Sequence, residues 1–303
     1  MSEWTRGFAA VIGVCLVWGL SPIYYRLLVD VPVVEVLAQR TIWSLLLFLL
    51  ILGLQGRLAL LRDALAGPQL GRIALAATAV SVNWGIFIWA VQAGHVVQSS
   101  LGYYIFPLVA VLIGLVLFGE RLSRAQGLAV VLAGLAVTVL TWGLGVVPWI
   151  SLGLALSMGL YGAAKKALTM DPVVSVAAEV ALLTPLALGW LALQGAGLMP
   201  AALAHPVAFG ESLRLALLLA FTGPITAVPL ILFSYGARRV PLATLGLTFY
   251  LNPTLQFLCA VLLFAEPLTR WHVIAFAVIW GALALYSASA LRQARRAAPL
   301  ANG

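Results

Sequence analysis

The sequence predicts an all-α polytopic membrane protein, with ten transmembrane helices that form two inverted five-helix repeats around a central cavity. Three observations lead to this prediction: an apolar composition, ten long apolar runs, and a pattern that recurs in the two halves of the chain. Of the 303 residues, 63% are hydrophobic and 9% are charged, and the mean hydropathy is +1.10. A water-soluble core does not need so many apolar residues, whereas a helical bundle in a membrane does.

Ten apolar runs are long enough for helices that cross a bilayer, which takes about 20 residues. The first run is long and no small-x-small cleavage pattern follows it, so we interpret it as a retained helix rather than a signal peptide. Both cysteines, Cys15 and Cys259, lie inside runs, and we expect them to be packing residues. The runs cover residues 6–28, 34–54, 71–92, 97–118, 124–142, 146–168, 173–193, 212–234, 240–264 and 269–291.

Basic residues are distributed unevenly between the two sides of the membrane that these runs define. If the N-terminus is cytoplasmic, 13 of the 17 basic residues fall in cytoplasmic loops and tails, and only Arg26, Arg214 and Arg270 fall on the other side. This positive-inside bias predicts that both termini are cytoplasmic. It also accounts for the net charge of +8 without a nucleic-acid partner, which we do not expect. The 13 residues are Arg6, Arg57, Arg62, Arg72, Arg121, Arg124, Lys165, Lys166, Arg238, Arg239, Arg292, Arg295 and Arg296.

The two halves of the chain share an ordered pattern of residues. It predicts a first repeat at residues 1–144 and a second at residues 145–303, with five spans each. Because five is odd, the second repeat enters the membrane inverted, as in many secondary transporters whose site lies at the repeat interface. The matches at an offset of 146 are Tyr104 and Tyr250, Pro107 and Pro253, Phe118 and Phe264, Glu120 and Glu266, Leu122 and Leu268, and Arg124 and Arg270; those at an offset of 140 are Gly13 and Gly153, Gly19 and Gly159, Leu20 and Leu160, and Arg26 and Lys166.

The ninth run carries a polar residue at every fourth position. Thr244, Thr248, Asn252 and Gln256 therefore share one face of a helix. Lipid contact would make that face costly, so we expect it to look onto protein or a water-filled cavity.

Further residues are expected to complete the walls of that cavity. Ser and Thr hydroxyls in membrane helices often bond only to their own backbone, and deep aromatic residues often only pack, so both alternatives stay open for each position. Runs five and ten have almost no polar side chains between residues 128–137 and 273–283, and we expect them to be peripheral. The expected wall residues are Trp18, Ser21, Tyr25, Asn83, Trp84, Ser100, Tyr103, Tyr104, Tyr161 and Tyr250.

Ionisable residues inside the runs are stronger candidates for function. Glu179 lies six residues into the seventh run, about 9 Å along a helix axis. An unpaired charge at that depth costs several kcal/mol, so Glu179 should be protonated or paired with Lys165 or Lys166. For Arg40 and Lys166 the alternative is that the long side chain reaches the interface from near a helix end.

Prolines interrupt four of the candidate cavity runs, at Pro22, Pro107, Pro229 and Pro253. Each removes a backbone hydrogen bond and permits a kink, which suits helices that move as gates. The sequence has no P-loop, no HExxH, no GxSxG and no metal-ligand cluster. We therefore expect no enzyme activity, no catalytic residue, no cofactor and no metal site, and any transport should be passive or coupled to an ion gradient.

Several motifs along the chain also resemble those of a known group. They are Trp18-Gly19 with Pro22 and Tyr24, Glu35 with Arg40 and Trp43-Ser44, Asn83-Trp84 with Phe87-Ile88-Trp89-Ala90-Val91, Ser100-Leu101-Gly102-Tyr103, Pro107-Leu108, Gly119-Glu120-Arg121-Leu122, and Tyr161-Gly162 with Lys165-Lys166. With these motifs the chain resembles the EamA-type transporters of the drug/metabolite transporter superfamily, and most of all its RarD-type permeases. It departs from them at Phe106, where an Asn often precedes the proline, and at Gln126-Gly127, where Gln-Trp is common.

The resemblance implies ten helices in two inverted repeats, a central cavity, and transport of small molecules; related groups include the YddG-type amino-acid exporters. Together with the residues, it predicts a secondary transporter of the bacterial inner membrane that exports amino acids or similar small metabolites by alternating access. A coupling proton is one option, and the oligomeric state is left open. The alternatives are a drug-efflux permease, a flippase for lipids or lipid-linked intermediates, and a membrane scaffold without transport.

Overall fold

The computed structural model describes residues 2–119, 123–240 and 242–297, and within these ranges every regular element is a helix. This confirms the prediction of an all-α polytopic membrane protein. Glu120, Arg121 and Leu122 of the repeated pattern lie outside the described residues. The helices are α1 Glu3–Gly19, α2 Ser21–Arg26, α3 Val33–Leu54, α4 Leu58–Ala66, α5 Leu70–Gln92, α6 Val96–Phe118, α7 Arg124–Leu144, α8 Trp149–Lys166, α9 Pro172–Gly195, α10 Leu213–Ala237, α11 Leu242–Phe249, α12 Leu251–Leu258, a π-helix Cys259–Leu263, and α13 Arg270–Ala297.

Eight of the ten expected spans are helices long and apolar enough to cross a membrane, counting α1 and α2 together and considering only the described residues. The sixth and ninth spans differ. The sixth, α8, has 18 residues and ends with two lysines, and it packs between α5 and α6, so protein rather than lipid surrounds much of it. The ninth is divided into α11, α12 and the π-helix. The amphipathic helix α4, in the loop between the second and third spans, was not predicted.

Proline explains where the first and ninth spans break. Pro22 cannot donate a hydrogen bond to the carbonyl of Trp18, and Pro253 cannot donate one to Phe249. The chain accordingly divides at Leu20, between α1 and α2, and at Tyr250, between α11 and α12. Pro107 and Pro229, by contrast, lie inside the continuous helices α6 and α10.

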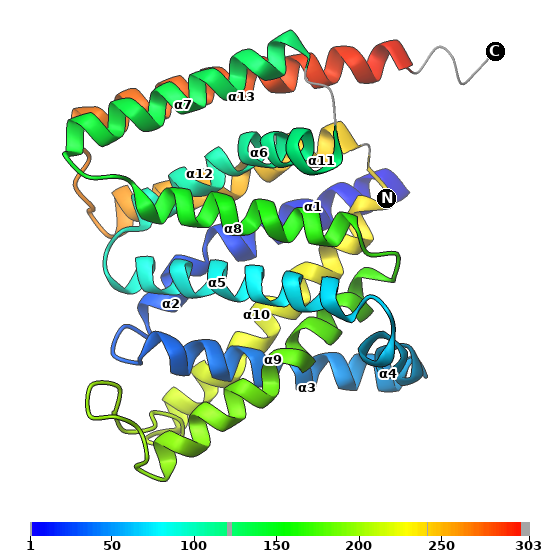
Figure 1. Ribbon diagram of the computed structural model, residues 1–303, viewed down its shortest axis with the longest axis vertical. Helices are drawn as coiled ribbons and strands as arrows, with labels where there is room; N and C mark the ends of the chain where they lie inside the picture. The colour runs from blue at the N-terminus through cyan, green and yellow to red at the C-terminus, as the bar shows by residue number, and fades with distance from the viewer. Residues whose placement is uncertain (1, 120–122, 241, 298–303) are drawn as a thin grey trace.

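Figure 1 shows that α1 begins and α13 ends at the same side of the bundle, on the right of the view. We call this the terminal side; it also carries α4 and the connection between α8 and α9. The turns between α2 and α3, α5 and α6, and α9 and α10 lie on the opposite side. Helices α7 and α13, the fifth and tenth spans, pack against each other along one edge of the molecule.

Close helix contacts recur at matched positions of the two halves. Gly19 approaches Leu255 of α12 so closely that an added Cβ would lie 2.7 Å from its Cβ. Gly159 approaches Ile113 and Val109 of α6 at 2.7 Å and 3.2 Å in the same sense. Gly159 is the counterpart of Gly19 at an offset of 140, and Leu255 is the counterpart of Val109 at an offset of 146. The same residue types therefore allow the same approach between the first and fourth spans of opposite halves.

Two turns with a left-handed backbone also occupy matched positions. Gly119 follows α6 with a φ of 62°, and Ala265 follows the π-helix with a φ of 51°. The turn at Ala265 directs Glu266 onto the N-terminus of α6, where its two carboxylate oxygens each accept a 2.8 Å hydrogen bond from the amides of Val96 and Val97. An acidic side chain at a helix N-terminus satisfies amides that have no partner within the helix. Glu266 therefore joins the end of the ninth span to the start of α6.

Asp171 joins three segments on the terminal side. It accepts hydrogen bonds from the amides of Val173 and Val174 at the start of α9, and it pairs with Arg57 at 3.2 Å and Arg238 at 3.7 Å. Partial burial opposes ionisation of this carboxyl, but the hydrogen bonds from Arg57 and from the two amides outweigh it, and the pKa of Asp171 lies below its usual value. The loop after α3, the start of α9 and the end of α10 are therefore held together by one ionised carboxylate.

Replacing Ala265 by glycine should stabilise the protein. A side chain in the left-handed region costs about 1–2 kcal/mol, part of which the greater freedom of glycine in the unfolded chain offsets. We expect Ala265→Gly to raise the Tm in detergent slightly and the mirror variant Gly119→Ala to lower it. A lower Tm for Ala265→Gly would contradict the strain at this turn.

Asp171→Asn should lower stability at neutral pH but not in acid. Because the pKa is lower in the folded state, the stabilisation is complete above the unfolded value of about 4 and is lost as the pH falls through the folded value. Asparagine keeps the helix cap, so the variant isolates the charge. We expect the Tm difference from wild type that is present at pH 7 to shrink progressively as the pH falls below about 4. Asp63→Asn, at an exposed acid paired only with Arg62, serves as the control and should leave the Tm unchanged.

Candidate functional site

Lys165 and Glu179 form the ion pair that the sequence analysis considered for the interior. The ammonium nitrogen of Lys165, near the end of α8, lies 2.7 Å from Oε1 of Glu179 in α9. The Ser175 hydroxyl joins the pair, 2.5 Å from the lysine nitrogen and 3.0 Å from Oε1. The ring centre of Tyr161, one turn before Lys165, is 5.6 Å from the same nitrogen. Lys166, the other candidate, is exposed at the end of α8.

The two members of this pair differ in exposure. The side chain of Glu179 is 1% exposed, whereas that of Lys165 is 23% exposed. The second carboxylate oxygen of Glu179, Oε2, is buried without a hydrogen-bond partner among the described residues. The buried carboxylate of Glu179 therefore depends on Lys165 and Ser175 for its polar contacts at Oε1.

Arg40 is a further charged residue of the interior, for which the sequence also allowed a side chain that reaches the interface. The structure places it inside the bundle, 5% exposed, with Nη1 donating a 2.8 Å hydrogen bond to the hydroxyl of Tyr25. The guanidinium carbon lies 3.9 Å from the ring centre of Trp84 and 5.8 Å from that of Tyr25. Both aromatic residues were among the expected wall residues.

Asn83 connects this region to α8. Its amide nitrogen donates 3.0 Å hydrogen bonds to the carbonyl of Leu154 and to the hydroxyl of Ser157, and its oxygen accepts one of 2.9 Å from Tyr103. Ser157 begins the row of fours that continues to Tyr161 and Lys165. The polar groups around Arg40 and those around Glu179 are thus linked through α8.

Other expected wall residues form separate local contacts. Tyr104 shares a 2.6 Å hydrogen bond with Thr254, stacks on Tyr250, and meets Phe276 and Trp280 of α13 edge-on. Tyr103 and Tyr104, which are neighbours in the chain, therefore have different surroundings. Whether the pair Tyr104 and Tyr250 ever faces a cavity stays a prediction.

The hydroxyl-bearing candidates are mostly bonded to nearby backbone. Ser21 donates to the carbonyl of Trp18 at 2.7 Å, which is the carbonyl that Pro22 leaves without its usual partner. Ser100 donates to Val97 at 2.8 Å and Thr248 to Thr244 at 2.7 Å, while Asn252 accepts from Gln256 at 3.0 Å. Trp18 meets the ring of Phe249 edge-on. For Ser21, Ser100 and Thr248 these bonds agree with the alternative that the hydroxyl bonds only to nearby backbone. A role of these residues in substrate contact stays a prediction.

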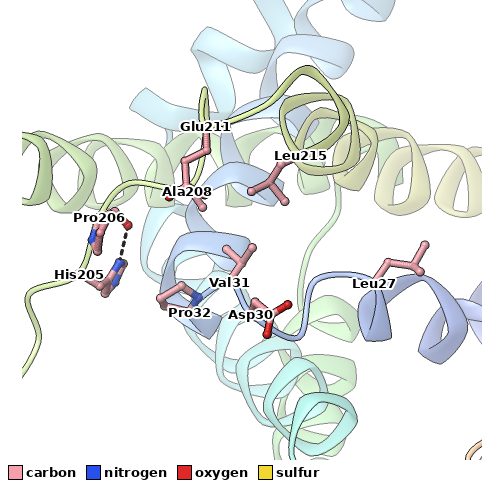
Figure 2. Close-up of a pocket in the computed structure, with 9 residues that line it drawn as sticks. All are labelled: Leu27, Asp30, Val31, Pro32, His205, Pro206, Ala208, Glu211 and Leu215. Atoms are coloured by element: carbon pink, nitrogen blue, oxygen red, sulfur yellow. Dashed lines mark hydrogen bonds between the residues drawn. The ribbon is translucent and has the colours of Figure 1, made fainter.

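A pocket of about 330 Å³ opens on the opposite side, between the α2–α3 turn and the loop before α10. In Figure 2, Asp30, Val31 and Pro32 face the segment from His205 to Ala208 across it. Beneath it Glu35, fully buried, accepts hydrogen bonds from the amides of Ala208 and Phe209 at 3.1 and 2.9 Å. None of the expected wall residues lines this pocket; Glu35 instead holds the long loop against α3.

Three groups that lie in the interior were not among the expected wall residues: Arg40, Glu35 and Ser157. Arg40 and Glu35 lie within eight residues of the start of α3, where a charge near a helix end has an easy alternative at the interface. The spacing of Ser157 from Tyr161 and Lys165 was a usable signal, since all three share one helical face.

Comparisons with known proteins agree with this architecture. The EamA-like transporter family matches residues 5–142. The chain is 46% identical to Protein RarD of Streptomyces exfoliatus, with 97% of this chain and 92% of that protein covered. It is 42% identical to an uncharacterized transporter of Pseudomonas aeruginosa, with 96% of each covered, and 34% identical to a protein of the same organism named Chloramphenicol-sensitive protein RarD, with 91% and 92% covered.

A solved crystal structure shares the fold, with a TM-score of 0.56 at 21% identity, and covers 94% of this chain and 97% of that chain. The matched relatives are named as transporters or RarD proteins rather than as enzymes. The chain is therefore a membrane transporter that belongs to the EamA-like transporter family and, within it, to the RarD-type permeases.

Proposed function

We propose that this permease is a secondary transporter that exports amino acids or similar small metabolites across the bacterial inner membrane by alternating access. The observation that carries the proposal is the Lys165–Glu179 pair, a 2.7 Å contact between a buried acid and a partly exposed base inside a membrane bundle. Ionisable groups at such depth are costly and typically mark substrate or ion pathways. Nothing in the scaffold alternative requires such a pair.

The proposal includes two inverted repeats, residues 1–144 and 145–303, that rock against each other. The matched approaches of Gly19 and Gly159 and the matched left-handed turns at Gly119 and Ala265 support this division. Contacts between the halves are present on both sides: Arg57 with Asp171 on the terminal side, and Glu35 with the loop at 208–209 on the other. Alternating access requires that one of these contacts opens while the other holds.

Glu179 is our candidate for the proton site, with Lys165 as the group that competes with the proton. When the carboxyl is protonated, the ion pair is lost and α8 and α9 are free to separate. Thus proton binding at Glu179 would be linked to the position of α8, whose face carries Ser157 and Tyr161. A drug-efflux permease is the second candidate function, because the name of one relative refers to chloramphenicol.

Transport in proteoliposomes tests the role of the pair. A single change leaves a buried partner uncompensated, which costs about 3–5 kcal/mol in a fully buried pair; the double variant Lys165→Gln with Glu179→Gln removes both charges and should fold. We expect it to lose pH-gradient-driven export of amino acids while keeping substrate exchange. Asp63→Asn is the matched control. Wild-type rates and pH dependence in the double variant would show that the pair is structural, and chloramphenicol as the only transported compound would favour the drug-efflux alternative.

Reporter fusions test the membrane orientation. The basic residues of the terminal side predict that a fusion after Gly56 and one at the C-terminus report a cytoplasmic location, whereas one after Gln194 reports the external side. An external C-terminus or an external 55–70 loop would contradict the proposed inverted topology.

A further inference from the structure

Arg40 carries a charge that the described part of the protein does not neutralise. It is the eighth residue of α3, about 10 Å along the helix from Val33. Its side chain is 5% exposed. The ion pairs of the described residues join other partners, and no carboxylate lies within 4 Å of the guanidinium. Burying an ion without a counter-ion is expensive, so this position needs an explanation.

Aromatic rings compensate the charge only in part. Trp84 covers the guanidinium at 3.9 Å and Tyr25 lies at 5.8 Å. Such contacts attract a desolvated cation, but a ring face carries no full negative charge and does not replace a counter-ion. The rings therefore hold the guanidinium in place and leave a net positive charge.

One edge of the guanidinium has no acceptor. Nη1 is bonded to the Tyr25 hydroxyl, whereas Nε is buried without a hydrogen-bond partner among the described residues. Nε and Nη2 together form the side of the fork that a planar carboxylate engages with two parallel hydrogen bonds. The tyrosine thus occupies one edge, and the Nε of the other edge has no acceptor among the described residues.

The corresponding place in the second half of the chain holds an ion pair. At the offset of 140 that relates the starts of the halves, Tyr25 corresponds to Lys165 and Gln39, next to Arg40, corresponds to Glu179. In the second half an internal carboxylate neutralises the base at 2.7 Å. In the first half the residue equivalent to Glu179 is Gln39, whose amide oxygen accepts a 3.1 Å hydrogen bond from Trp43, so this position supplies no carboxylate to Arg40.

We propose that Arg40 binds the carboxylate of the transported substrate, with Tyr25, Trp84 and Tyr103 as the walls around it. This inference rests on the proposed transport function and narrows its substrate to small organic monocarboxylates, amino acids included. One cation whose Nε lacks an acceptor among the described residues, with aromatic rings around it, suits a singly charged carboxylate better than a doubly charged phosphate. Asn83 and Ser157 connect the surroundings of the carboxylate site to α8, the helix that also carries Lys165.

Matched compounds separate the carboxylate from the rest of the ligand. The probes are leucine, 4-methylpentanoate, which lacks the amine, and 3-methylbutylamine, which lacks the carboxylate, with the corresponding sets for methionine and alanine. Binding to purified protein is followed by tryptophan fluorescence, because an anion at Arg40 changes the surroundings of Trp84. We expect a response to the carboxylates and none to the amines. It should disappear in Trp84→Phe and persist in Trp142→Phe, at a residue that is 85% exposed.

Variants of Arg40 give the second measurement. We expect Arg40→Gln to weaken carboxylate binding at least tenfold and Arg40→Lys to weaken it less, while Arg214→Gln, at an exposed arginine, binds as wild type does. Unchanged carboxylate affinity in folded Arg40→Gln would overturn the inference. The inference would also be overturned if none of the carboxylates changed the tryptophan fluorescence of the wild-type protein. This outcome counts against the site even if the Arg40 variants fail to fold.

The binding and transport measurements distinguish failure of the Arg40 site from failure of the transport proposal. A wild-type protein that binds carboxylates through Arg40 but moves none of them across proteoliposomes would refute the transport proposal and keep the site. A protein that exports these compounds equally well as Arg40→Gln would refute the site and keep the transport proposal.

Discussion

The constraint on which the structure depends is that a membrane interior supplies no water to polar groups. Each polar atom inside the bundle must find a partner within the protein. Where Pro22 removes a backbone donor, the Ser21 hydroxyl bonds to the freed carbonyl of Trp18. Where α5 meets α8, Asn83 bonds to the backbone and to a serine of the neighbouring helix. The same rule makes the few unsatisfied groups informative, since each has a cost that packing alone does not explain.

Most of the fold could be predicted from the sequence because the need to satisfy backbone hydrogen bonds acts within each span. Apolar runs of sufficient length must be helices in a bilayer, and their limits agree with the helices that were found. The short helix α4 and the division at Tyr250 were missed for physical reasons. Helix α4 lies outside the spans, where an amphipathic segment gives a weak signal, and the break depends on Pro253 acting four residues upstream.

The candidate site could be predicted less completely because it depends on which helix faces which. Glu179 was recognisable, since an acid six residues inside a span has no path to the interface, and its partner was expected within the last two residues of α8. Arg40 has a long side chain near a helix start, so its inward position depends on Trp84 and Tyr25 of other helices. The neighbours Tyr103 and Tyr104 point to different surroundings because successive residues are about 100° apart on a helix.

The Arg40 and Glu179 regions suggest how transport in one direction could be coupled to a proton gradient. In matched places near the ends of the first span of each half, one half holds Tyr25 against Arg40 and the other holds Lys165 against Glu179. The first contact lies toward the opposite side, near the start of α3, and the second toward the terminal side, near the end of α8 (Figure 1). A carboxylate that neutralises Arg40 and a proton that neutralises Glu179 would then act on different sides of the same bundle. Because each removes or supplies one charge in a low-dielectric interior, binding at one site changes the cost of the charge at the other, which is the coupling that an exporter driven by a gradient requires.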